Sequence, residues 1–428
     1  MRPAARVQAA IEMIASVLAR RQPADRLSDE YLRARRYVGS KDRRAIADLV
    51  YRVLRHRGRL EWAMGEVPTD PLSHARSLVI AELAATGAIA DQLFDGSQYG
   101  PALLSERERR LIGTEGEGRG SAPPWVLANC PPWLTPEFAP EVATNPRVLL
   151  GDPDARAPLD LRVNTLRATR EEVLVQLQRE GIAAVPTPIA PNGIRVAGSL
   201  RLDAHQLFRD GTIEVQDEGS QIVAAVCRAV PNEIVIDFCA GAGGKTLAFA
   251  AAMGGRGRLV ACDVDSRRLG ELERRARRAG ATNITTHIAD AALAAPAIEQ
   301  GDLVVLDVPC SGSGTWRRNP DAPWRLSPEV LEGYRDSQRR ILASGANLVR
   351  PHGRLAYITC SLFPSENGAQ IEAFLAAHPA WRRRDLRADW QRFTPRPWPG
   401  TDDGDLVLAP GTTETDGFFL AIVEPAAK

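Results

Sequence analysis

The sequence lacks closely spaced cysteine pairs, and its six cysteines stand far apart in a chain of 428 residues. No group of cysteine and histidine has zinc-ligand spacing, so we expect no metal site. Scattered cysteines in a chain of this size also argue against a disulfide framework, and free thiols are expected. No apolar run is long enough to span a bilayer, and the first residues do not form the apolar block of a signal peptide. These absences predict a cytoplasmic protein with no membrane partner.

Lysine is scarce, because only Lys41, Lys245 and Lys428 occur and arginine supplies nearly all the positive charge. A lysine within a motif is therefore of interest. The formal net charge is only +1, yet residues 1–60 contain 15 Arg and Lys against 6 Asp and Glu, a local excess of +9. This asymmetry indicates either a basic part that contacts RNA or a solvated face on a small helical bundle.

The hydrophobic pattern divides the chain into three parts. Residues 1–112 have apolar positions at helical spacing, with a turn and helix start at residues 39–42. Residues 113–230 begin with a linker rich in Gly, Glu and Pro and continue as a small module of short strands and one helix. Residues 231–428 alternate buried strands with helices, which predicts a parallel, doubly wound sheet. No internal repeat is present.

A glycine-rich loop follows the first strand of the third part and leads into a helix. A phosphate-binding P-loop requires glycine where Cys239 stands, and the GxGxxG fingerprint requires glycine where Thr246 stands. A loop that holds an adenosyl group with an amino-acid tail fits better, since glycines allow close approach and a helix N-terminus offers amide donors. The expected cofactor contacts in this loop are Cys239, Ala240, Gly241, Ala242, Gly243, Gly244 and Lys245.

Carboxylates stand at the ends of the following strands. Asp263 ends the second strand, where a carboxylate accepts hydrogen bonds from ribose hydroxyls, and Asp290 ends the third, where it can meet an adenine edge. An aspartate in either position, taken alone, is more often a helix cap or a loop residue than a ligand contact. Together they favour a ligand site, to which we also assign Arg268 and Asp307.

Two cysteines, Cys310 and Cys360, end the fourth and fifth strands at the same edge of the sheet, whereas the thiols of Cys227, Cys239 and Cys262 are expected to be inert and buried. A thiol beside such a cofactor suits methylation of cytosine. Carbon C5 of that ring is too electron-poor to attack a sulfonium methyl group, and thiolate addition at C6 makes C5 nucleophilic. Asp307 can hydrogen-bond the ring, and Lys245 can stabilise charge or lower a thiol pKa. The residues alone leave open which cysteine attacks.

Three motifs resemble the Sun/Fmu family of RNA 5-methylcytosine methyltransferases. The motifs are DFCAGAGGKT, DVPCSGSG and YITCS, the last followed by Pro364, Glu366 and Asn367. The resemblance implies S-adenosylmethionine as cofactor, Cys360 as the nucleophile, and Cys310 as the residue that helps to release the product. Asp307 and Lys245 complete the expected catalytic set. One departure is visible, because Gly241 and Ala242 replace the Ala-Pro of the family loop.

The resemblance extends toward the N-terminus. Residues 158–221 resemble the family's small RNA-recognition-like module, and residues 33–55 resemble the NusB-like domain of the bacterial ribosomal-RNA branch. The expected α/β fold is thus a Rossmann-like S-adenosylmethionine-dependent methyltransferase domain, preceded by an all-α NusB-like domain and the small α/β module. After Cys310, the aromatic and arginine residues from Trp316 to Trp324 suit stacking on splayed-out RNA bases, or form a packed surface loop.

These observations predict a monomeric enzyme that methylates cytosine C5 in RNA, with ribosomal RNA as the first choice and transfer RNA as the second. A methyltransferase for DNA cytosine or protein is an alternative that the Cys360 motif and the arginine-rich first part disfavour. A non-catalytic RNA-binding assembly factor is another alternative, which the presence of both Cys360 and Asp307 disfavours.

Overall fold

The computed structural model describes residues 1–20, 22–88, 91–112, 121–198, 200–289 and 298–426, and the chain forms two compact units. Unit 1 comprises Met1–Arg156 together with Trp316–Ser327, and unit 2 comprises Ala157–Thr315 together with Pro328–Lys428. The small α/β module is therefore grouped with the large sheet. The three-domain division remains a prediction.

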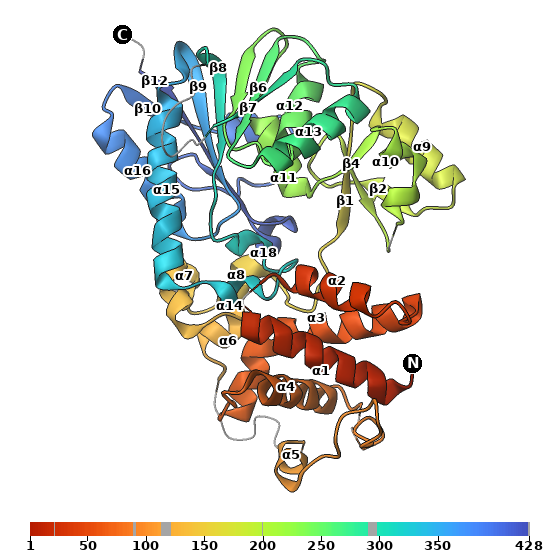
Figure 1. Ribbon diagram of the computed structural model, residues 1–428. Helices are drawn as coiled ribbons and strands as arrows, with labels where there is room; N and C mark the ends of the chain where they lie inside the picture. The colour runs from red at the N-terminus through yellow and green to blue at the C-terminus, as the bar shows by residue number, and fades with distance from the viewer. Residues whose placement is uncertain (21, 89–90, 113–120, 199, 290–297, 427–428) are drawn as a thin grey trace. The chain divides into compact units, whose positions relative to one another are not determined.

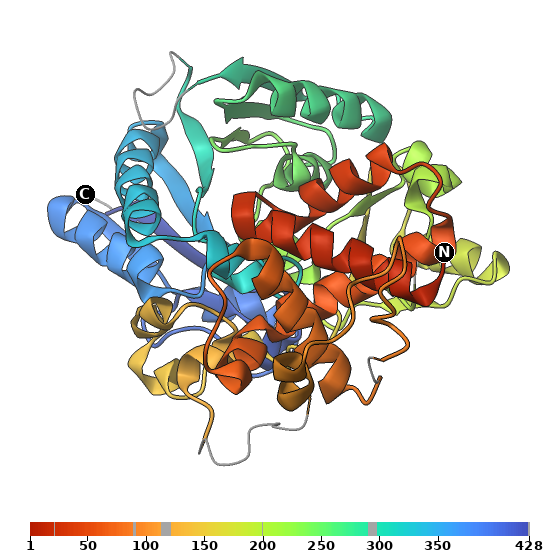
Figure 2. The same cartoon turned by 60° about the horizontal axis from the view of Figure 1, so that its bottom comes forward.

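Unit 1 is helical. Its long helices are α1 (Pro3–Arg20), α2 (Ala24–Ala34), α3 (Ser40–Met64) and α4 (Pro71–Ala85). They lie side by side in red and orange in Figure 2, and their apolar faces form one core that includes Ile14, Val53 and Leu78. Helix α4 begins earlier than its apolar pattern at Ser77 because Asp70 caps it, accepting a hydrogen bond from Ser73 N at 2.8 Å. The shorter helices of this unit are α5 (Glu106–Leu111), α6 (Pro124–Ala128), η1 (Pro132–Glu137), α7 (Pro140–Ala143), α8 (Arg147–Leu150) and α14 (Ala322–Arg325).

Unit 2 begins with a small antiparallel sheet in the order β2-β3-β1-β4. Its elements are β1 (Leu159–Val163), α9 (Arg170–Arg179), β2 (Ala184–Pro186), β3 (Gly193–Val196), η2 (Leu202–Ala204), α10 (Gln206–Arg209) and β4 (Ile213–Val215). Thr169 and Glu172 form a capping box that starts α9, and Val173 and Leu177 pack this helix against Leu161. The expected strands and helix of the small module are confirmed.

The large sheet has the order β10-β12-β9-β8-β5-β6-β7, with β11 paired to β12. Its strands are β5 (Ile234–Asp237), β6 (Arg258–Asp263), β7 (Ile284–Ile288), β8 (Gly301–Asp307), β9 (Val349–Thr359), β10 (Trp381–Arg384), β11 (Leu406–Leu408) and β12 (Phe418–Pro425). The five neighbouring strands β7, β6, β5, β8 and β9 run parallel to one another, as predicted. The predicted parallel arrangement does not extend to the C-terminal strands, because β12 pairs antiparallel with β9, β10 and β11.

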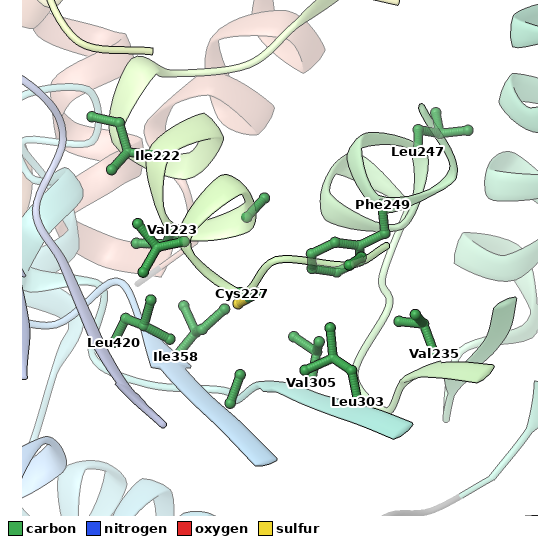
Figure 3. Packing of buried hydrophobic residues seen from close by; sticks show 14 of the residues in the cluster. Ile222, Val223, Cys227, Val235, Leu247, Phe249, Leu303, Val305, Ile358 and Leu420 are labelled. Atoms are coloured by element: carbon green, nitrogen blue, oxygen red, sulfur yellow. The ribbon is translucent and has the colours of Figure 1, made fainter. Parts of the chain in front are cut away.

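Helices cover both faces of the large sheet. Leu303 and Val305 of β8 face one core, and Val304 and Leu306 face the other. Figure 3 shows the first core, where α11 (Glu218–Val226) and α12 (Gly244–Ala252) pack on the strands. Helix α13 (Ser266–Ala279) contributes to the same core, whereas α15 (Pro328–Ala346) and α16 (Gly368–Ala377) cover the other face (Figure 1). The remaining short helices are η3 (Ser313–Thr315), η4 (Pro364–Glu366), α17 (Arg387–Gln391) and α18 (Pro410–Thr413).

The strand order creates a switch point beside β5. The chain runs from β5 to β6 and β7 on one side, then returns to β8 on the other side of β5. Loops that leave neighbouring strands in opposite directions open a crevice at the carboxyl edge, which is where open α/β sheets bind ligands. The glycine loop and both predicted cysteines lie at this edge.

Candidate functional site

The glycine loop joins β5 to α12 in a conformation that few residues adopt. Gly241 has φ +54° and Gly243 has φ +85°, both in the left-handed region, and Gly243 N donates to Ala240 O at 2.9 Å. A Cβ added at Gly243 would lie 2.6 Å from Leu272 Cγ of α13. The backbone at Gly243 is therefore pressed against α13, and a side chain at this position is excluded.

Asp263 holds the start of this loop from the end of β6. Its Oδ2 accepts a hydrogen bond from Gly241 N at 2.8 Å, and its Oδ1 accepts one from Asp265 N at 2.9 Å. The expected carboxylate thus lies against the loop, as the sequence predicted. Arg268, in the first turn of α13, is exposed. Asp290 lies outside the residues that the structure describes.

Asp237 and Thr246 belong to the same site, although the sequence did not single them out as functional. Thr246 Oγ1 donates to Asp237 Oδ2 at 2.6 Å, and both side chains are buried. Burial raises the pKa of Asp237 to about 7, even though the hydrogen bond from Thr246 acts to lower it. Asp237 Oδ1 has no hydrogen-bond partner in the described part of the chain. This carboxyl group is therefore a buried acceptor directly below the glycine loop.

Lys245 and Asp307 form an ion pair across the crevice. Lys245 Nζ lies 2.7 Å from Asp307 Oδ2, and the lysine side chain is 8% exposed whereas the carboxylate is 33% exposed. Burial acts to lower the pKa of Lys245, but the charge and hydrogen bond of Asp307 outweigh it, and the pKa is raised. Lys245 is therefore a charged group at the start of α12, and Asp307 keeps one side open to solvent.

The two predicted cysteines lie side by side at the ends of β8 and β9. Cys310 Sγ and Cys360 Sγ are 3.4 Å apart, and both residues are partly buried. The hydrogen bond with Cys360 and burial hold the pKa of Cys310 well above its usual range. Cys310 therefore remains a thiol that can donate a hydrogen bond to Cys360 Sγ. All six cysteines are free, as expected.

A buried carboxylate ties the two cysteine loops together. Glu366 is fully buried and accepts hydrogen bonds from Ser311 N at 2.9 Å, Ser311 Oγ at 2.5 Å and Ser361 Oγ at 2.6 Å. Ser311 and Ser361 directly follow the two cysteines in sequence. Gln338 Nε2 of α15 adds a fourth hydrogen bond at 3.0 Å. Glu366 appeared in the sequence motif without a role, and only the fold reveals that it holds both loops.

The aromatic residues that follow Cys310 pack against other side chains, which favours the interpretation of this segment as a packed surface loop. Trp316 is 5% exposed and meets Phe138 edge-on, with ring centroids 6.1 Å apart. The guanidinium of Arg57 lies 4.0 Å from the centroid of the Trp324 ring. Trp316 thus belongs to the interior of unit 1, whereas Trp324 is half-buried. The interpretation that these residues stack on RNA bases is wrong for Trp316 and stays a prediction for the rest of the segment.

Within the described ranges, no group of three or more His, Cys, Asp or Glu side chains can hold a metal ion. Within the same ranges, no helix combines the length and apolar character that crossing a bilayer requires.

Two family models match the chain, one over most of the large-sheet region and one from the end of the first part of unit 1 into the small sheet. Residues 224–424 match the model described as 16S rRNA methyltransferase RsmB/F. Residues 130–203 match the ferredoxin-like domain of RsmF/B-like methyltransferases, and the order β2-β3-β1-β4 is consistent with that domain.

Similar proteins agree with these matches. The ribosomal RNA small subunit methyltransferase B of Sodalis glossinidius is 30% identical over 421 residues, which is 90% of each protein. The probable methyltransferase B of Synechocystis is 36% identical over 272 residues, and that match spans only 60% of the relative's length. The crystal structure of PH0851 has a TM-score of 0.77 at 27% identity and covers 99% of both chains. That of NSun6 from Pyrococcus horikoshii with SFG, at 18% identity and a TM-score of 0.60 over 71% of this chain and 98% of that one, shows the fold alone. The chain belongs to the RsmB/F family of 16S rRNA methyltransferases.

Proposed function

We propose that this protein transfers a methyl group from S-adenosylmethionine to carbon C5 of cytosine in RNA, with small-subunit ribosomal RNA as the substrate. The observation that carries the proposal is the pair of thiols 3.4 Å apart at the edge where the glycine loop and the Lys245–Asp307 ion pair also lie. Relatives named ribosomal RNA small subunit methyltransferase B support the RNA class.

The residues around the glycine loop fit the cofactor. A Cβ added at Gly241 or Gly244 would meet no atom within 4 Å, so the backbone there faces open space. The first amides of α12 and the buried Oδ1 of Asp237 offer partners for an amino-acid tail, and Asp263 offers a carboxylate for a ribose. When bound, S-adenosylmethionine supplies an electrophilic methyl group. The residues proposed to hold it are Cys239, Ala240, Gly241, Ala242, Gly243, Gly244, Lys245, Asp263, Arg268, Asp290 and Asp307.

Cys360 is the proposed nucleophile. Its thiolate forms a bond to C6 of cytosine, the C5–C6 π electrons shift into the ring, and C5 then takes up the methyl group. The division of roles follows the family resemblance, and the geometry is compatible with it: the two sulfurs are 3.4 Å apart, so the Cys310 thiol can stabilise a Cys360 thiolate by donating a hydrogen bond. In the final step a base removes the C5 proton, the double bond re-forms, and the Cys360 sulfur leaves C6. Cys310 assists this release.

Asp307 and Lys245 are the proposed polar partners of the ring. Asp307 is the more exposed member of the pair and can accept a hydrogen bond from the exocyclic amine or from protonated N3. Lys245 stays charged and opposes the negative charge that develops during addition. Because the pair is already formed, this polar environment requires little reorganisation when the base enters.

The first part of the chain supports RNA binding by charge. Residues 1–60 carry the +9 excess, and phosphate contacts by this NusB-like helical part would add affinity without sequence preference. Cytosine has to leave its stack before a thiol can reach C6, so a loop or single-stranded region is the expected target.

Transfer of labelled methyl from S-adenosylmethionine to ribosomal and transfer RNA tests the proposal in wild type, Cys360→Ala and Cys310→Ala. We expect methylation of ribosomal RNA by wild type and no methylation or adduct by Cys360→Ala. Cys310→Ala should accumulate a covalent protein–RNA complex that resists denaturant. Methylation of neither RNA by wild type would refute the function, and loss of the adduct in Cys310→Ala alone would reverse the two thiol roles.

A further inference from the structure

Arg275, in the third turn of α13, connects three separate segments of unit 2. Its Nη1 donates a hydrogen bond to the carbonyl oxygen of Ala242 at 2.6 Å, and its Nη2 lies 3.0 Å from Glu214 Oε2 on β4. The side chain of Arg275 is only 16% exposed. One guanidinium therefore joins the glycine loop of the large sheet to a strand of the small sheet.

The anchor for this guanidinium is itself fixed. Glu214 is 3% exposed, and its second oxygen pairs with Arg278, whose guanidinium lies 4.4 Å from the Phe208 ring centroid. Asn164 adds a second tie between the small sheet and α13, because its Nδ2 donates to Ala279 O at 2.8 Å. A buried carboxylate with two arginine partners cannot turn away without leaving a charge unpaired. The position of Arg275 is therefore set from the small sheet.

The contact falls at Ala242, in the middle of the glycine loop. Ala242 lies between two residues in the left-handed region, and its amide donates no hydrogen bond within the described part of the chain. In the motif that the loop resembles, proline occupies this position and limits φ covalently. In this chain the carbonyl of Ala242 is instead held by a hydrogen bond from outside the loop.

We propose that Arg275 is a positioning residue for the cofactor loop, and that it fixes the backbone at Ala242 in place of a proline. The proposal rests on the proposed function only for the identity of the cofactor. Arg275 acts on the loop and does not take part in the chemistry at the cysteines. Its loss should therefore weaken cofactor binding and leave the thiol reaction at saturating cofactor unchanged.

Three variants separate this role from simple stabilisation of the fold. Arg275→Ala removes both contacts, whereas Arg275→Lys keeps a positive charge near Glu214 but lacks the planar fork that reaches two acceptors. Arg277→Ala, two residues along the same helix on an exposed side, is the matched control. Binding of S-adenosylhomocysteine, measured by calorimetry, should weaken on the order of 10-fold in Arg275→Ala and in Arg275→Lys, and stay unchanged in Arg277→Ala. The KM for S-adenosylmethionine should rise while kcat is retained.

The decisive variant is Ala242→Pro combined with Arg275→Ala. A proline that replaces the function of the hydrogen bond should restore affinity in the double variant, so that the two changes are strongly non-additive. A merely structural role for Arg275 predicts that the losses add. Additive losses, or an unchanged affinity in Arg275→Ala, would overturn the proposal.

Hydrogen exchange of the cofactor-free protein gives a readout that does not depend on the cofactor's identity. The amides of Gly241 and Gly243 are hydrogen-bonded, so exchange across residues 238–246 reports the order of the loop. We expect faster exchange there in Arg275→Ala than in wild type or Arg277→Ala. If wild type binds no S-adenosylhomocysteine but exchange is still faster in Arg275→Ala, the positioning role of Arg275 is supported and the proposed function is contradicted. Unchanged exchange in Arg275→Ala contradicts the positioning role alone.

Discussion

Glu366 offers the sharpest test of how the two thiols are held. The substitution Glu366→Gln keeps the shape of the side chain and removes its charge. It replaces one acceptor oxygen by an amide that only donates, in a place where four donors converge. The hydroxyls of Ser311 and Ser361 can rotate to accept from that amide, but the Ser311 backbone N–H cannot. One or two of the four hydrogen bonds are therefore lost.

The magnitude follows from burial. A hydrogen bond to a charged group contributes about 1.5–3 kcal/mol, and a buried donor left without a partner costs about 1–3 kcal/mol. Since Glu366 is fully buried, solvent cannot replace the lost partners. The free energy of unfolding of unit 2 should fall by about 2–4 kcal/mol. The separation of the two cysteine loops should also become less defined.

Urea unfolding followed by circular dichroism measures the loss of unfolding free energy. The rate of adduct formation with RNA in the Cys310→Ala background reports whether the two cysteine loops are still held in place. Glu372→Gln, an exposed carboxylate on α16, is the control and should change neither quantity. A loss below about 1 kcal/mol together with an unchanged rate of adduct formation would refute the reasoning, because it would mean that the four contacts do not hold the loops.

Three further predictions concern single side chains. Gly243→Ala should destabilise the protein by about 2–4 kcal/mol in urea, because its Cβ would collide with Leu272 at a positive φ. Asp405 is 1% exposed, and burial raises its pKa to about 7. Wild type should therefore lose stability relative to Asp405→Asn as the pH rises from about 4 to about 7, by roughly 4 kcal/mol, with no further loss above that; a constant difference across that window in thermal unfolding would contradict it. Lys245→Met should lower the rate of methyl transfer on the order of 100-fold, because it leaves Asp307 unpaired beside the ring. A rate within a few-fold of wild type would show that the charge of Lys245 does not stabilise the reacting ring.

The sequence was sufficient for the elements that a local pattern encodes. Strands β5, β6, β8 and β9 are continuous apolar runs because both of their faces are covered, and the predicted residues Asp263, Asp307, Cys310 and Cys360 lie at their carboxyl ends. The antiparallel direction of β12 was not predictable from its apolar pattern, which is the same for either direction.

The parts of the site that depend on packing were not predictable. Glu366 is one acidic residue among many in sequence, and its role arises only when β8, β9 and α15 bring four donors to one point. The role of Arg275 was not predictable either, because its helix contains five other arginines. Its hydrogen bonds with Ala242 and Glu214 appear only in the folded structure. The prediction for Trp316 was wrong for the same reason, since a tryptophan that stacks on a base and one that fills a core have the same local sequence.

Unit 1 is discontinuous, and this has a consequence for synthesis of the chain. Its first portion ends at Arg156, yet Trp316 and the segment to Ser327 complete its interior. Asp321 accepts a hydrogen bond from Ala24 N, which is 297 residues earlier in the chain. On the ribosome the N-terminal helices therefore emerge long before their last partners, and unit 1 reaches its final packing only after the small sheet and strands β5 to β8 have been translated. Unit 1 is thus the first to appear but cannot be completed at once, and until Trp316 is translated the apolar surface that receives it stays exposed in the nascent protein.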